Sequence, residues 1–291
     1  MDPPRSGNPV LVAVDSLDHV QQLLRTAGDL ARLGAGTVRL VTVAVKASDS
    51  PFSVLDDETI VREFADPSHE LLERAQTPEG VTVERDVLVA RSAAKGLLGA
   101  VEETDPAALV VGWRGRSTPG DVVFGTTVDR LVERAPCDLY VERVGREANG
   151  VDSVLLAVAG GPHVETAARV AAAIALPNQA SVTVLSVDTG DGDAAAFAEA
   201  GRAAVAAAVT PEVPVETSVE ARDDVTDAVA EAAAAHDVVV LCATRKGALR
   251  RKIAGSVPRR VVDRTDQTVV LARSGESVSG PLHRLGELLR R

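Results

Sequence analysis

Short, valine-rich apolar runs alternate along the chain with stretches whose apolar residues follow the 3.6-residue spacing of a helix. Runs that are apolar on both faces, separated by helices of about 10–15 residues, predict parallel strands covered by helices on both sides. Among the helices are 93–104 and 224–235. The expected strands are 10–16, 37–45, 82–90, 108–112 and 137–143, followed by 154–160, 181–188, 214–222, 237–242 and 268–273.

This order of strands and helices occurs twice, with an interruption near 145–150. Right-handed crossovers then give an α/β fold of two doubly wound, five-stranded parallel-sheet domains. We place the domains at 1–147 and 148–275. In the remaining tail, 276–291, leucines at 282, 285, 288 and 289 predict a short amphipathic helix, which we expect to dock on its own chain rather than on a membrane or a partner.

Composition narrows the class of protein. A length of 291 residues, 45% hydrophobic and 25% charged, is typical of two globular domains. The net charge of −11 disfavours nucleic acid as a partner. There is no apolar run of about 18–20 residues and no secretory pattern at the start, so we expect a cytoplasmic protein without membrane insertion. Cys137 and Cys242 lie in separate apolar runs and are expected to be reduced and buried.

The candidate chemistry follows the first and fourth strands of the first half. In open parallel sheets, ligands bind beyond the carboxyl ends of the strands, where the strand order reverses. Asp15 follows the first strand, and Gly112, Gly115, Gly125 and Thr126 follow the fourth. Glycines allow a backbone to approach a ligand closely, and a helix start offers free N–H groups to a phosphate. The alternative is a glycine-rich turn before an ordinarily capped helix.

Neighbouring side chains also suit a nucleotide. Asp15 could accept hydrogen bonds from a base or sugar, and Arg114 and Arg116 add positive charge to the loop. Thr126 and Thr127 offer hydroxyl groups at the start of the following helix. The first half therefore predicts a nucleotide site.

The spacing Gly112-x2-Gly115-x9-Gly125-Thr126 matches in full the hallmark of the ATP-binding subgroup of universal stress proteins, which the chain resembles as two tandem copies. The resemblance implies the adenine nucleotide alpha hydrolase-like fold, with the halves paired as a pseudo-dimer. It also implies ATP, AMP or ADP as ligand, with Mg²⁺ bridging phosphates. Asp15 and Val43 would then contact adenine. The loop 112–125, which we call the glycine loop, would hold ribose and phosphates together with Thr126 and Thr127.

The second copy departs from this pattern. Ala159 stands where the aspartate belongs, and Cys242 and Arg245 stand at the first two glycine positions. The loop is instead basic, so it is either an anion site for another ligand or a solvated charged surface. The candidate anion site comprises Arg245, Lys246, Gly255, Ser256 and Val257.

Several catalytic patterns are missing from the sequence. It contains no Walker A motif, no G-x-S-x-G and no metal-ligand spacing of histidines or cysteines. His163 follows a first strand and is expected to cap or line its loop. We therefore expect a nucleotide-dependent switch read by an unidentified protein partner, at most a slow ATPase. The resemblance implies that this switch serves a stress response. The alternatives are an interaction module that regulates a transporter, and a nucleotide-dependent enzyme that uses the loop 159–163.

Overall fold

The structure, a computed structural model, describes residues 8–34, 36–46, 55–114, 125–146, 148, 150–190, 192–243 and 256–278. In its first half the elements are β1 (Val10–Ala13), α1 (Leu17–Arg32), β2 (Thr37–Val45), α2 (Asp57–Phe64), α3 (Asp66–Glu73), β3 (Thr82–Ala90), α4 (Ala93–Thr104), β4 (Ala108–Trp113), α5 (Thr126–Arg134) and β5 (Asp138–Arg143).

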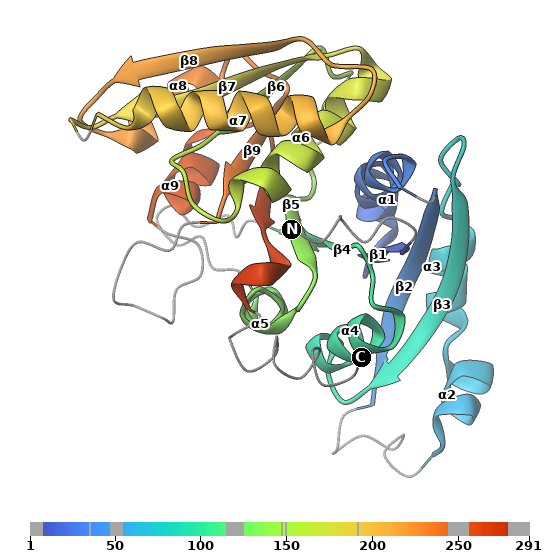
Figure 1. Cartoon of the computed structure of the whole chain (residues 1–291). Coiled ribbons are helices and arrows are strands. Elements are labelled where there is room, and N and C mark those ends of the chain that lie inside the picture. Colours follow the sequence, from blue (N-terminus) through green and yellow to red (C-terminus); the bar gives the residue numbers. More distant parts are fainter. Residues whose placement is uncertain are drawn as a thin grey trace, which may run out of the picture.

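The second half repeats most of this order (Figure 1). Its elements are β6 (Ser153–Ala157), α6 (Val164–Asn178), β7 (Ser181–Asp188), α7 (Ala194–Ala208), β8 (Val215–Ala221), α8 (Val225–Ala233), β9 (Val238–Cys242), α9 (Ser256–Arg264), β10 (Thr268–Arg273) and the 3₁₀ turn η2 (Gly275–Ser277).

The ten strands of the described residues join one sheet, in the order β3-β2-β1-β4-β5-β10-β9-β6-β7-β8. Within each half the strands are parallel, and the halves meet where β5 pairs antiparallel with β10. Val141 of β5 faces Leu271 of β10, which stands 130 positions later, so this pair marks the centre of a pseudo-twofold axis. The predicted α/β class, doubly wound in each half, is confirmed.

One expectation about the connections is wrong. We expected a single helix between successive strands, yet β2 and β3 are joined by both α2 and α3. Helix α2 ends at Phe64, and Pro67 lies in the first turn of α3. Proline is tolerated in a first turn but not in a helix interior, so one continuous helix could not cross this point.

Two strands end earlier than their apolar runs suggested. β1 stops at Ala13, because Ser16 already caps α1 by accepting a hydrogen bond from the Asp18 N–H at 3.3 Å. β6 stops at Ala157, ahead of Gly160 and its neighbour Gly161, which both adopt positive φ and turn the chain. Asp15 is thereby left outside its strand, at the edge where ligands bind in such sheets.

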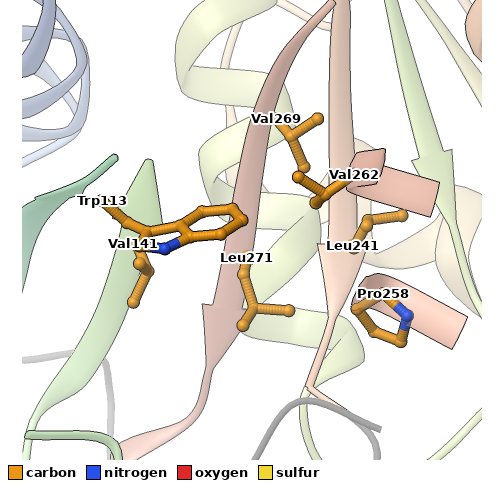
Figure 2. A pocket seen from close by; sticks show the side chains of 7 residues that line it. All are labelled: Trp113, Val141, Leu241, Pro258, Val262, Val269 and Leu271. Atoms are coloured by element: carbon orange, nitrogen blue, oxygen red, sulfur yellow. The ribbon is translucent and has the colours of Figure 1, made fainter. Parts of the chain in front are cut away.

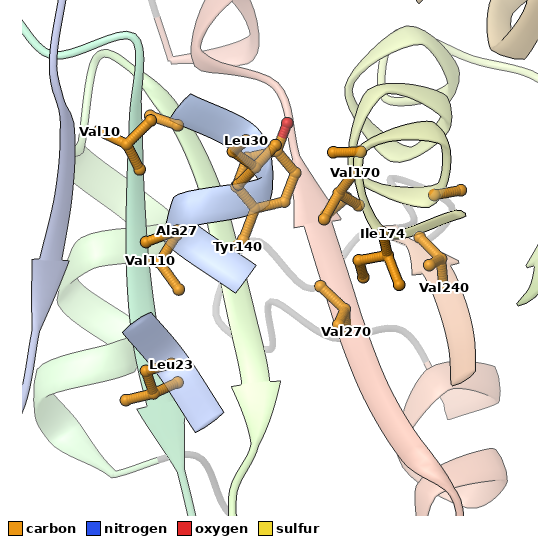
Figure 3. Packing of buried hydrophobic residues seen from close by; sticks show 14 of the residues in the cluster. Val10, Leu23, Ala27, Leu30, Val110, Tyr140, Val170, Ile174, Val240 and Val270 are labelled. Carbon is orange, nitrogen blue, oxygen red and sulfur yellow. The ribbon is translucent and has the colours of Figure 1, made fainter. Parts of the chain in front are cut away.

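The sheet buries one apolar cluster on each face, and each cluster contains residues of both halves. On the face covered by α4, α5, α8 and α9, the indole of Trp113 lies over β5 and points toward β10 (Figure 2). On the other face, Leu23 and Leu30 of α1 and Val170 and Ile174 of α6 pack over the central strands (Figure 3). The two halves therefore share their cores.

Polar contacts reinforce this junction. The hydroxyl of Tyr140, buried in β5, donates to the Thr166 carbonyl of α6 at 3.1 Å. Asp138 pairs with Arg169 at 2.7 Å and accepts a hydrogen bond from the Gly275 N–H at 3.0 Å. The segment that follows β10 is thus tied back to the first half.

Candidate functional site

The structure brings the predicted first-half residues to one edge of the sheet. β1 lies between β2 and β4, and the chain leaves β1 and β4 in opposite directions, so the strand order reverses between these two strands. Ala13 is level with Val111, which places Asp15 near the last residues of β4. Arg114 Nη2 lies 4.0 Å from Asp15 Oδ1, and the Asp15 side chain is 89% exposed. The two charges meet at an open surface.

Gly112 has a packing role that the sequence did not reveal. A Cβ at this position would lie 2.9 Å from Val144 Cγ1 and 3.0 Å from Leu23 Cδ1. Glycine therefore allows α1 to pack closely on the end of β4. Close packing is therefore a second reason for a glycine here, in addition to the expected approach to a ligand. The same packing holds the base of the glycine loop in place.

Within the described residues, no side chain caps the start of helix α5. Gly125 is its N-cap residue, with φ −63° and ψ 157°, and a Cβ there would meet no atom within 4 Å. Thr126 is exposed and Thr127 is half-buried in the first turn. Because the first N–H groups of a helix have no partner within it, this open start can bind an anion. Gly115 and Arg116 lie outside the described residues.

Val41 of β2 pairs with Ala13 of β1. Two residues further along the chain on each side, Val43 therefore lies level with Asp15. A Cβ on Gly96 of α4 would lie 3.0 Å from Val43 Cγ1, so the absence of a side chain at Gly96 makes room for the valine. Val43 is half-buried. It offers an apolar wall beside the carboxylate of Asp15.

The corresponding edge of the second half is more closed. Gly160 has φ +69°, and a Cβ there would lie 2.6 Å from the ring of Phe197, so this ring packs directly on the loop after β6. Phe197 comes from the first turn of α7, and nothing in the sequence pattern marked it. Cys242 ends β9, and burial raises the pKa of its thiol to about 12, which leaves it unreactive. Cys137 and Cys242 are both buried and form no disulfide, as expected.

His163 lies at the start of α6 and is buried, with its Nδ1 accepting a hydrogen bond from the Ser274 N–H at 3.1 Å. The ring thus joins its loop to the end of β10. Of the second candidate site, Val257 is half-buried in the first turn of α9 and Ser256 opens that helix. Arg245, Lys246 and Gly255 lie outside the described residues, as does the predicted tail helix.

Two further features were sought within the described residues. They hold no group of three histidine, cysteine, aspartate or glutamate side chains placed to bind a metal ion. None of the helices in this part of the chain is long and apolar enough to cross a membrane.

Residues 8–143 match the sequence model of the Universal stress protein family. The first half of the chain belongs to this family. The match ends at the last residue of β5 and so includes the Asp15 edge, the glycine loop and α5. The second half has the same strand order in the same sheet.

Solved structures share this universal stress protein fold over nearly the whole chain. A universal stress protein from Archaeoglobus fulgidus is 17% identical, covering 94% of this chain and 98% of its own, with a TM-score of 0.65. A putative universal stress protein from Pseudomonas aeruginosa is 16% identical, covering 98% and 99%, with a TM-score of 0.57. The cytoplasmic domain of a prokaryotic cation chloride cotransporter is 13% identical, covering 92% and 96%, with a TM-score of 0.51. The comparison with curated proteins gives no match.

Proposed function

We propose that the first half binds ATP or a related adenine nucleotide and acts as a ligand-dependent regulatory switch. The observation that carries this proposal is the start of α5, which no described side chain caps. In the chain this helix follows the glycine loop, which begins at the sheet edge where Asp15 and Arg114 meet. An open helix start, an arginine and an exposed carboxylate are the three kinds of group that phosphates and a base or sugar require.

Each residue has a place in this proposal. Asp15 and Val43 hold the base, and the backbone at Gly112 and Gly115 follows the ribose. Magnesium prefers oxygen ligands and keeps several waters, so an ion held mainly by phosphate oxygens fits the few protein oxygens offered here by Asp15 and Thr126. The phosphate-binding set comprises Arg114, Arg116, Gly125, Thr126 and Thr127.

The switch depends on the loop between Arg114 and Phe124, which would order around the phosphates and present a surface to a protein partner. A ligand shifts such an equilibrium only by its differential affinity for the two states. Efficient phosphoryl transfer requires a positioned nucleophile and a charge clamp, and the described part of this edge offers neither. Binding rather than turnover is the proposed activity.

Calorimetric titration of the nucleotide-free protein with ATP tests this site. Gly125→Asp places a carboxylate where phosphate would bind, while the φ and ψ of Gly125 and the free space around it suit an aspartate N-cap. The helix is therefore retained while the anion is repelled. Gly255→Asp is the matched control, because residue 255 follows residue 125 by 130 positions, as α9 follows α5.

We expect one ATP site in the wild type and in Gly255→Asp, and none in Gly125→Asp. Loss of binding only in Gly255→Asp would move the site to the second half and overturn the proposal. No heat from the wild type across a range of salt concentrations would also overturn it and favour an interaction module.

A further inference from the structure

A buried arginine at the junction of the halves has one donor group to spare. Arg273 is 4% exposed, and its Nη1 and Nη2 donate to the Ser274 and Ala135 carbonyls at 2.9 and 2.8 Å. Its Nε–H is buried and meets no acceptor within the described residues. A buried cation is costly unless an anion lies beside it, and the Asp138 carboxylate pairs with Arg169 instead. The guanidinium therefore favours a different anion.

The pairing of β5 with β10 brings a thiol to this guanidinium. Arg273 stands opposite Leu139 in the antiparallel ladder, and Cys137 precedes Leu139 by two residues in the same apolar cluster. Because side chains alternate along a strand, Cys137 and Arg273 share one face of the sheet, as diagonal neighbours within reach of a long side chain. The Ala135 carbonyl that Arg273 binds lies two residues before Cys137. The backbone of Gly275 closes over this place, since a Cβ on Gly275 would lie 2.6 Å from the Cys137 carbonyl carbon.

The two cysteines of the chain differ in their surroundings. At Cys242, burial alone raises the pKa of the thiol to about 12. At Cys137, burial is opposed by the neighbouring charge. Burial lowers the pKa of Arg273 to about 10, and an anionic Cys137 acts on it in the opposite direction. A cation beside a thiol stabilises the thiolate, and the attraction is strongest where water is excluded.

Other titratable groups near Cys137 do not compete with Arg273. Asp138 and Tyr140 lie on the opposite face of β5, where Asp138 is held in its ion pair. Burial raises the pKa of Tyr140 well above its ordinary value, so this side chain carries no charge. The charged side chains at the end of α5 and in η2 are exposed to solvent, namely Glu133, Arg134 and Glu276.

We propose that Arg273 holds Cys137 as a thiolate and that this thiolate is a modification site for hydrogen peroxide, a molecule little larger than water. The sulfur attacks one peroxide oxygen, an S–O bond forms as the O–O bond breaks, and the second oxygen leaves as hydroxide. The sulfur loses two electrons to the peroxide and becomes a sulfenic acid, whose oxygen can accept the spare Nε–H of Arg273. Because β5 runs parallel to β4, the site lies at the opposite edge of the sheet from Asp15 and does not depend on the nucleotide.

Peroxide oxidation of the intact wild-type protein at pH 6.5 and pH 8.0 tests this site. After removal of the peroxide, the remaining thiols are alkylated in denaturant, and both cysteine peptides are quantified by mass spectrometry. An ordinary thiol, with a pKa of about 8.5, gains about 20-fold in thiolate and in rate over this interval. We expect the rate at Cys137 to change less than about threefold, and to exceed the rate at Cys242 at least about tenfold at pH 6.5.

Cys242 is the matched control within the same molecule. It is 8% exposed against 4% for Cys137, so exposure alone predicts the reverse order of rates. Oxidation through unfolding of the whole chain would affect both cysteines alike. Equal rates, a rate at Cys137 that rises with pH like that of an ordinary thiol, or no oxidation of Cys137 would each overturn the proposal.

Two substitutions test the role of the arginine. Arg273→Met removes the cation and should restore the rise of about 20-fold in the Cys137 rate between pH 6.5 and pH 8.0. Arg273→Lys keeps a cation and should keep the rate nearly independent of pH. The readout is a ratio of two rates of one thiol, so a general increase in its exposure does not alter it. A flat profile in Arg273→Met or a steep one in Arg273→Lys would overturn the part given to Arg273. If Arg273→Met does not fold, the wild-type rates still decide whether the thiolate exists.

Discussion

Arg143 and Arg273 stand 130 positions apart, and each donates hydrogen bonds to the end of the last helix in the opposite half. Arg143 Nη1 lies 2.6 Å from the Thr265 carbonyl and 3.0 Å from that of Val262. Arg273 Nη2 lies 2.8 Å from the Ala135 carbonyl. A cation at a helix C-terminus satisfies free carbonyls and opposes the negative end of the helix dipole. The halves thus terminate each other's helices.

Replacing each arginine by methionine should have unequal effects. Arg273 is buried, burial lowers its pKa to about 10, and its loss leaves the Ala135 carbonyl without the guanidinium donor. The Ser274 carbonyl keeps its hydrogen bonds from the Ser277 N–H and hydroxyl. We expect Arg273→Met to lower the free energy of unfolding by about 3 kcal/mol, and Arg143→Met, at a half-buried position that water can reach, by about 1 kcal/mol. Urea unfolding measures both, and equal losses would contradict this explanation.

Asp29 of α1 should make stability depend on pH. Burial raises its pKa from 3.8 to about 6, against the opposing charges of Arg32, 2.5 Å away, and Arg25. The folded protein therefore holds this proton more tightly than the unfolded chain, and the free energy of unfolding falls as the pH rises from 4 to 6, then levels off. Relative to Asp29→Asn, the wild type should gain about 1 kcal/mol between pH 7 and pH 5. If the wild type instead lost stability relative to Asp29→Asn between pH 7 and pH 5, the raised pKa of Asp29 would be contradicted.

Two glycines of α4 should respond oppositely to alanine. At Gly99 an added Cβ meets no atom within 4 Å, so Gly99→Ala should stabilise the protein by about 0.5–1 kcal/mol through helix propensity. At Gly96 the Cβ would lie 3.0 Å from Val43 Cγ1 and 3.1 Å from Ala90 Cβ. Gly96→Ala should therefore destabilise by about 1 kcal/mol as Val43 is displaced. Thermal unfolding of the two variants checks this. A stabilising effect of Gly96→Ala would show that Val43 is loosely packed against α4.

The carboxylate of Asp15 should contribute to nucleotide affinity. Losing a hydrogen bond to a charged acceptor costs about 1.5–3 kcal/mol, so Asp15→Asn should weaken ATP binding about tenfold or more. Asp18→Asn, an exposed acid in the first turn of α1, serves as control and should change affinity less than about twofold. The rise in melting temperature with ATP concentration reports both affinities. Similar behaviour of the two variants would remove Asp15 from the site.

Local sequence patterns predicted most of the fold. Periodicity located β2 at Thr37–Val45, β3 at Thr82–Ala90 and α4 at Ala93–Thr104 with the observed bounds, because alternating apolar runs and helical spacing are local properties. The break between α2 and α3 was missed, although Pro67 was there to indicate it. The early end of β1 at Ala13 was hidden because Val14 continues the apolar run beyond the strand.

The geometry of the candidate site was predictable only where its residues follow strand ends. Asp15 and Arg114 were expected together because both follow strands that meet where the order reverses, and they lie 4.0 Å apart. The reach of Trp113 across β5 toward β10 and the packing of Phe197 on Gly160 could not be foreseen. Such contacts join positions far apart in the chain and depend on how two halves pack, which spacing within one half does not encode.

Joining β5 to β10 within one polypeptide makes the association of the two halves intramolecular. A linker of a few residues holds such partners at an effective concentration of about the millimolar range, whatever the concentration of the protein itself. Dilution then cannot separate one half from the other. A gene for such a chain is also free to change one half without changing the other, and Trp113 and Ala243, 130 positions apart, are one pair that differs between the halves.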